Sequence, residues 1–183
     1  AQRADLPRLE HFEQSSLSPR MIILASQSPR RAELLQQIGV DFQQSPADID
    51  ETPRAGELPA DFVKRMAMDK ALAVHALHPQ ARVLGSDTSV VLDGQILGKP
   101  ENREQAIAML LALSGRTHQV LTGVALIHEN ADYALSESRV TFRQLSRDEI
   151  ERYWRSGEPA DKAGSYAIQG HAAVFIEHIE GSY

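Results

Sequence analysis

The segment from residue 83 to residue 97 constrains the fold more strongly than any other stretch of the chain. Two runs rich in β-branched and apolar residues, Val83–Leu92 and Gln95–Leu97, are separated by the dipeptide Asp93-Gly94. Asp-Gly is a favoured two-residue turn, because both central residues of a type I′ turn need a positive φ. The pattern therefore predicts a β-hairpin, and with it an antiparallel pair of strands.

Helical and strand-like segments alternate along the rest of the chain. Helix-capping residues, namely Ser28, Asn102 and Ser146, precede three of the predicted helices. We expect helices over residues 29–38, 60–77, 103–113 and 147–156, and further strands over 21–25, 120–127, 134–145 and 172–179. A hairpin among alternating strands and helices indicates an α/β fold with a mixed β-sheet flanked by helices.

The first 20 residues differ from the rest of the chain. They mix both charge signs and lack an apolar period, whereas Met21 opens the first strand-like run. We expect residues 1–20 to be an extension outside the fold and residues 21–183 to form a single domain. A short arm packed on that domain is the alternative for the extension.

Composition limits the classes of function. The chain has no cysteine, which excludes disulfides, thiolate catalysis and cysteine-ligated metal sites, and favours a reducing, cytoplasmic compartment. A formal net charge of −6 argues against a nucleic-acid polymer or an anionic membrane as partner. No apolar run approaches the roughly 20 residues that span a bilayer. A small anion in a local basic pocket remains compatible with these limits.

The segment SQSPRRAELL places polar and basic side chains at a predicted helix start. Unpaired backbone N–H groups and the helix dipole make such an end an anion site. Arg30 and Arg31 in the first turn oppose the dipole unless an anion compensates, and Ser26 and Ser28 add hydroxyls. The pattern favours phosphate binding over a solvated helix start.

Two charged residues occupy apolar patterns. Lys70 falls on the helical stripe formed by Val63, Ala67 and Val74, so its ammonium either extends outward along its stem or points into a functional cleft. Both interpretations stay open on the residues alone. Asp87 lies within an apolar β run, where a carboxylate is costly unless it is paired, hydrogen-bonded or metal-bound. A purely structural aspartate is the alternative.

Two loops carry further candidates. Asp48, Asp50 and Glu51 cluster in a proline-containing loop and, with Asp87, provide enough of the hard oxygen ligands that Mg²⁺ or Mn²⁺ prefers. A solvated acidic loop is the alternative. The segment GQILGKP has the wrong glycine spacing for a Walker P-loop, and a proline follows its lysine. Lys99 can still reach a phosphate as a point charge.

Taken in order, these segments resemble the Maf family of nucleotide pyrophosphatases. The matching blocks span Met21 to Tyr183 and are LASQSPRRAELL, DIDETP, DKA, GSDT, GKP, LSGRTHQVLTGVAL, SGEPADKAGSYAIQG and IEGSY. The resemblance implies an elongated, two-lobed single domain with a central cleft, related to the inosine triphosphatases and usually homodimeric. Family members usually continue past GSY, so we expect a truncated C-terminal end, and GSDT replaces the commoner GADT.

The resemblance also implies a reaction. It predicts a divalent metal, Mg²⁺ or Mn²⁺, and hydrolysis of a nucleoside triphosphate, most readily dTTP or UTP, to the monophosphate and pyrophosphate. A pyrophosphatase for modified nucleotides such as 7-methyl-GTP, or a non-enzymatic nucleotide-binding regulator of cell division, is the alternative. In this assignment Asp87 accepts the proton from water and, with Glu51, binds the metal. The remaining expected site residues are catalytic Lys70 and Lys99, phosphate-binding Ser26, Ser28, Arg31 and Lys162, and base-selecting Arg30, Thr88 and Gln169.

Overall fold

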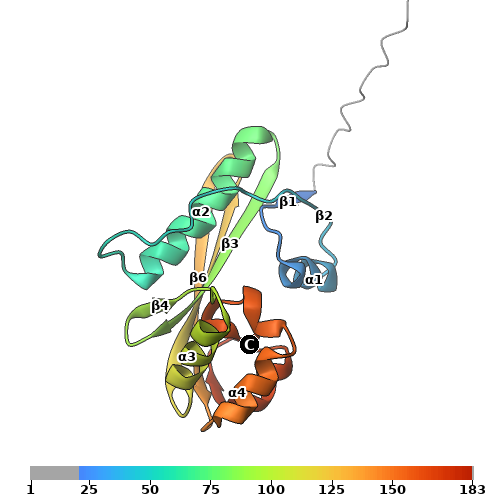
Figure 1. Ribbon diagram of the computed structural model, residues 1–183. Coiled ribbons are helices and arrows are strands. Elements are labelled where there is room, and N and C mark those ends of the chain that lie inside the picture. Colours follow the sequence, from blue (N-terminus) through green and yellow to red (C-terminus); the bar gives the residue numbers. More distant parts are fainter. Residues whose placement is uncertain (1–20, 183) are drawn as a thin grey trace, which may run out of the picture.

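The computed structural model describes residues 21–182, so the prediction for residues 1–20 lies outside the described part of the chain. The elements follow one another along the chain as shown in Figure 1, and they are β1 (Ile22–Leu24), α1 (Pro29–Gln37), β2 (Phe42–Gln44), α2 (Pro59–Leu77), β3 (Arg82–Leu92), β4 (Gln95–Leu97), α3 (Arg103–Leu113), β5 (Thr117–Ile127), β6 (Ala131–Phe142), α4 (Arg147–Trp154), the 3₁₀ helices η1 (Glu158–Asp161), η2 (Ala163–Ser165) and η3 (His171–Phe175), and β7 (Ile176–Glu180). Within residues 21–182 no helix has the length and apolar character needed to cross a bilayer.

The strands form one mixed sheet of seven strands in the order β2-β1-β3-β5-β6-β7, with β4 paired to β3. β1 runs parallel to both β2 and β3, while the other pairs are antiparallel. The predicted mixed α/β class is therefore confirmed. The hairpin is confirmed as well, because β3 and β4 meet through Asp93 and Gly94, whose φ values are 51° and 76°.

Two regions of packed side chains follow each other along the long strands. α2 lies on one face of β3 and β5, where Ala67 and Val74 are fully buried beside Val83, and Val63 is fully buried beside Val91 and Leu121. At the other end, α3, α4 and the 3₁₀ helices surround a second core, which centres on Phe142. This arrangement gives the molecule the elongated outline seen in Figure 1.

Two predicted strands were misplaced. The last strand, expected over 172–179, begins only at Ile176, because residues 171–175 form η3. The strand expected over 134–145 spans Ala131–Phe142. Conversely, β2 was missed, since its FQQ sequence is short, polar and largely exposed and so carries no apolar period.

The carboxylates of Glu57 and Glu149 give the fold a defined acid sensitivity. Hydrogen bonds from Arg65 to Glu57, and from Arg143 and Ser146 to Glu149, lower the pKa of each carboxyl from 4.5 to about 2. At pH values between the two pKa values, about 2 in the folded chain and 4.5 in the unfolded chain, these carboxylates bind protons in the unfolded chain but not in the folded one. The stabilisation is therefore complete above pH ~4.5 and is lost as the pH falls towards ~2.

Urea unfolding at pH 7, 4 and 3 checks this expectation. The wild-type midpoint is expected to fall as the pH is lowered through this range, and to fall less in the double variant Glu57→Gln/Glu149→Gln. Asp148→Asn, which changes an exposed carboxylate of the same region, is the matched control. Equal acid-induced losses in all three proteins would contradict the assignment.

Candidate functional site

The centre of the site lies where helix α2 packs tightly against strand β3 at Gly85. A Cβ atom added to Gly85 would lie 2.2 Å from the carbonyl oxygen of Ala67, so only glycine permits this packing. Asp87 lies two residues further on β3 and shares the face of Gly85. Its Oδ1 accepts a hydrogen bond of 2.8 Å from Lys70 Nζ, and both residues are 8% exposed. Lys70 therefore points inward to a carboxylate and does not extend to solvent.

A second carboxylate meets the same ammonium. Glu51, on the loop before α2, places Oε1 3.0 Å from Lys70 Nζ. Arg65 holds this loop against the helix, because its Nε and Nη2 each donate to the Glu57 carboxylate at 2.6 Å and Nη2 also donates to the Thr52 carbonyl at 3.1 Å. Sequence reasoning missed Arg65 and Glu57, since nothing local distinguishes this arginine from a solvated one on a helix surface.

The start of α1 brings a partly buried guanidinium, that of Arg31, to the same place. Burial lowers the pKa of Arg31, and the nearby carboxylates of Asp87 and Glu51 oppose that shift. Its Nη1 donates to Ser26 Oγ at 3.1 Å, and the Ser28 backbone N–H donates to the same oxygen at 3.1 Å. Ser28 in turn caps the helix by accepting from the Arg31 N–H at 3.5 Å. Two cations and two carboxylates are thus assembled from four separate elements of the chain.

The environment of Asp87 suits a proton acceptor. Burial is the main influence and raises the pKa of its carboxyl, Lys70 and Arg31 act to lower it, and Glu51 adds a smaller upward effect. Ser89 Oγ donates to Asp87 Oδ2 at 3.5 Å, an interaction the sequence did not indicate. A carboxylate with a raised pKa binds a proton more readily, and adjacent cations keep it ionised until one arrives.

The lysines of the other two loops lie together. Lys162 Nζ pairs with Asp161 Oδ1 at 2.6 Å, and the charge of Lys99 also acts on Asp161. The Gly164 N–H donates to the Gly98 carbonyl at 3.0 Å and so joins the two loops. The contacts found within residues 21–182 do not join either lysine to Asp87.

The three expected base-selecting residues lie apart from one another. Arg30 pairs with Glu33 at 3.5 Å on the exposed side of α1. Thr88 projects from the face of β3 opposite to Asp87, because neighbouring strand residues alternate, and its Oγ1 lies 3.1 Å from Thr122 Oγ1. Gln169 is exposed in the turn before η3. The structure thus gathers Ser26, Ser28, Arg31, Glu51, Lys70 and Asp87, whereas the hydrogen bonds and ion pairs found within residues 21–182 do not join Lys99, Lys162, Thr88 or Gln169 to them.

Glu51 and Asp87 are the residues that fit a divalent cation. Within the described residues no three His, Asp or Glu side chains converge on one point. Mg²⁺, however, is often held by one or two protein carboxylates and completes its shell with phosphate oxygens and water. Two carboxylates that already share one cationic partner, Lys70, match that donor set.

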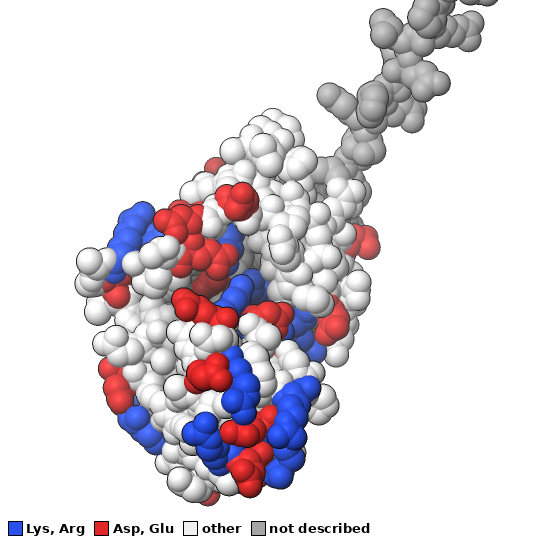
Figure 2. Space-filling view, viewed as in Figure 1, with Lys and Arg blue, Asp and Glu red and all other residues white. Residues whose placement is uncertain are grey.

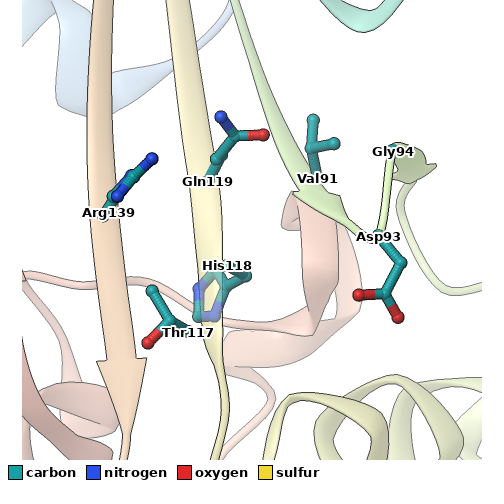
Figure 3. A pocket seen from close by; sticks show the side chains of 7 residues that line it. All are labelled: Val91, Asp93, Gly94, Thr117, His118, Gln119 and Arg139. Carbon is teal, nitrogen blue, oxygen red and sulfur yellow. The ribbon is translucent and has the colours of Figure 1, made fainter.

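A separate cavity lies at the far end of β3. It has a volume of about 240 Å³ and opens on the sheet, as Figure 3 shows, and its lining consists of Val91, Asp93, Gly94, Thr117, His118, Gln119 and Arg139. None of the expected site residues lines it. In the space-filling view, by contrast, acidic and basic side chains lie side by side around a hollow across the middle of the molecule (Figure 2).

Comparisons of the sequence with known proteins point to one family. The family model described as Maf: Maf-like protein matches residues 21–183. A protein of Alkalilimnicola ehrlichii named dTTP/UTP pyrophosphatase is 54% identical over 168 residues, which cover 88% of this chain and 83% of the relative. A protein of the same name from Myxococcus xanthus is 52% identical over 162 residues, covering 88% and 83%. Among solved structures, a HAM1 protein from Coxiella burnetii is 19% identical, with a TM-score of 0.49 and coverage of 67% of this chain and 72% of that one.

Proposed function

The chain belongs to the Maf-like protein family, and on that premise we propose that it hydrolyses nucleoside triphosphates, dTTP and UTP best of all, to the monophosphate and pyrophosphate. The observation that carries the proposal is the cluster in which the buried Lys70 contacts both the buried Asp87 and the exposed Glu51 beside the Arg31 guanidinium. The name dTTP/UTP pyrophosphatase, given to relatives that are 51–54% identical, supports the choice of reaction and substrate.

The triphosphate binds at the start of α1. Arg31 and the N–H groups behind the Ser28 cap attract the anion, and Ser26 holds the guanidinium in place. Lys70 neutralises charge that develops at the reacting phosphorus. Lys99 and Lys162 approach the distal phosphates from their joined loops. A fixed and buried cation such as Lys70 stabilises such charge more strongly than a mobile one in solvent.

Glu51 and Asp87 would hold Mg²⁺ or Mn²⁺. When bound, the metal supplies positive charge that polarises the phosphoryl oxygens. Both carboxylates keep their places through Lys70, and Glu51 also depends on the loop that Arg65 secures.

Water attacks the α-phosphorus, and Asp87 accepts its proton. A bond from the water oxygen to the α-phosphorus forms, the bond from that phosphorus to the bridging oxygen breaks, and pyrophosphate leaves. The raised pKa of Asp87 makes its carboxylate a stronger base than an exposed aspartate. The monophosphate keeps the base and the sugar.

The base is read by Gln169 and Arg30, whereas Thr88 points from the opposite face of β3 to Thr122 and supports this reading only from outside the cluster. A pyrimidine with a 4-keto group presents an acceptor beside the N3–H donor, and one glutamine amide satisfies both. Cytosine exchanges the two groups, with a 4-amine that donates and an N3 that accepts, so an amide held in the orientation that suits the 4-keto base is left with both of its groups unpaired. We further propose that the protein acts as a homodimer. We also propose that it works in the cytoplasm, a location with which a sequence without cysteine is compatible.

A panel of nucleoside triphosphates, assayed for pyrophosphate with Mg²⁺ or Mn²⁺, tests the proposal. dTTP and UTP are expected to have the highest kcat/KM, with CTP lower by at least about tenfold. Gln169→Glu is expected to weaken hydrolysis of both preferred substrates, because it removes the amide donor. Gln80→Glu, at an exposed turn after α2, is the matched control.

The possible results separate the parts of the proposal. A preference for purine triphosphates, or for 7-methyl-GTP, would refute the base assignment and leave the reaction intact. Release of orthophosphate would refute the position of cleavage. Nucleotide binding without any hydrolysis would indicate a regulator instead of an enzyme.

A further inference from the structure

A largely buried carboxylate lies inside the loop that carries Lys162 and Gln169. Glu158 opens η1, and its side chain is only 17% exposed. Its Oε1 accepts a hydrogen bond of 2.7 Å from the Tyr153 hydroxyl, and its Oε2 accepts one of 3.0 Å from the His171 backbone N–H. One side chain therefore joins α4, the first residue of η1 and the first residue of η3.

The same carboxylate is packed against the turn that precedes η3. A Cβ atom added to Gly170 would lie 2.4 Å from both carboxylate oxygens of Glu158, so the backbone passes directly beside it. Gly170 N–H donates to the Ala167 carbonyl at 3.0 Å and closes the turn. Ala167 N–H in turn donates to the Tyr153 hydroxyl at 3.2 Å. The turn Ala167–Gly170 is therefore held at both ends by the pair Tyr153 and Glu158.

We propose that Glu158 is a positioning residue for nucleobase selection, acting through the turn Ala167–Gly170 on the amide of Gln169. This inference rests on the proposed function, in which Gln169 reads the base. Gln169 lies within the turn and directly before Gly170, and its side chain makes none of the hydrogen bonds found within residues 21–182. The backbone of the turn therefore fixes the Cα atom from which the amide reaches the base. A hydrogen-bonding group that is displaced by about 1 Å loses much of its discrimination.

Steady-state kinetics with the full chain and saturating Mg²⁺ test the inference. The quantity measured is the ratio of kcat/KM for dTTP to that for CTP. Glu158→Ala is expected to lower this ratio by about tenfold, chiefly through a higher KM for dTTP. Glu158→Gln, which keeps an acceptor for the Tyr153 hydroxyl, is expected to lower it less, and Tyr153→Phe is expected to lower it as well. Asp148→Asn, at an exposed position of α4, is the matched control.

The ratio of the two kcat/KM values distinguishes a positioning role of Glu158 from a purely structural one. A purely structural role for Glu158 reduces the amount of active protein, which scales both values of kcat/KM equally and leaves their ratio unchanged. If the wild type prefers dTTP to CTP and Glu158→Ala has the same ratio as the wild type, the inference is overturned and the proposed function stands. If Glu158→Ala does not fold, the ratios of Glu158→Gln and Tyr153→Phe decide in the same way. A wild-type enzyme that does not distinguish dTTP from CTP overturns both the base assignment and the role of Glu158.

Discussion

Asp87→Asn is expected to lower the rate of pyrophosphate release by a factor on the order of 10³ while the protein stays folded. The amide keeps the size of the side chain and an oxygen for the Lys70 ammonium, but it neither accepts the proton of the attacking water nor binds a cation as a carboxylate does. Single-turnover kinetics with saturating dTTP and Mg²⁺ give the rate, and thermal melting gives the stability. Asp93→Asn, in the exposed turn of the same hairpin, is expected to match the wild type.

Retention of full activity by Asp87→Asn would remove the proton acceptor from the mechanism. It would also restore the hypothesis of a structural aspartate. A variant that still binds nucleotide but releases no pyrophosphate would agree with catalysis and would count against a regulator that needs binding alone.

Lys70→Met is expected to abolish most turnover and, in addition, to lower the free energy of unfolding by about 3 kcal/mol. The methionine keeps an apolar stem on the buried stripe of α2, but it leaves Asp87 in the interior without its nearest cation. It also leaves Asp87 and Glu51 facing each other as like charges. Urea unfolding at neutral pH in EDTA measures the change in stability without a contribution from bound metal.

A double-mutant cycle gives the control for this prediction. In Lys70→Met/Asp87→Asn the buried charge is gone, so most of the lost stability is expected to return, while activity stays absent. Additive losses of stability in the double variant would show that the two side chains do not depend on each other. Full activity in Lys70→Met would show that its ammonium has no part in turnover.

Much of the fold and the centre of the site could be predicted, because each signal was local. Ser28 and Ser146 mark helix starts through side-chain hydrogen bonds that span three residues. Asp93-Gly94 marks the hairpin through its backbone conformation. Lys70 and Asp87 stand out because a charge in an apolar pattern needs a partner, and each is the partner of the other.

The remaining features depend on contacts between distant parts of the chain. Arg65 contributes to the site because its guanidinium donates hydrogen bonds to Glu57 in the loop before α2. The last strand starts late because residues 171–175 form η3, and the first N–H of η3 donates to Glu158 in a hydrogen bond across 13 positions in the sequence. Thr88 was expected in the site, yet the alternation of strand β3 directs it to the opposite face from Asp87.

Gly85 has no side chain, and this allows α2 and β3 to place the charged groups of the site close together. Because the backbones of α2 and β3 touch there, main-chain packing fixes the separation of the two chain positions from which the Lys70 ammonium and the Asp87 carboxylate meet. Apolar burial around Ala67 and Val83 stabilises that spacing during folding. The charged groups therefore need little reorganisation when the substrate's charge redistributes, and a preorganised polar environment of this kind lowers the barrier in each catalytic cycle.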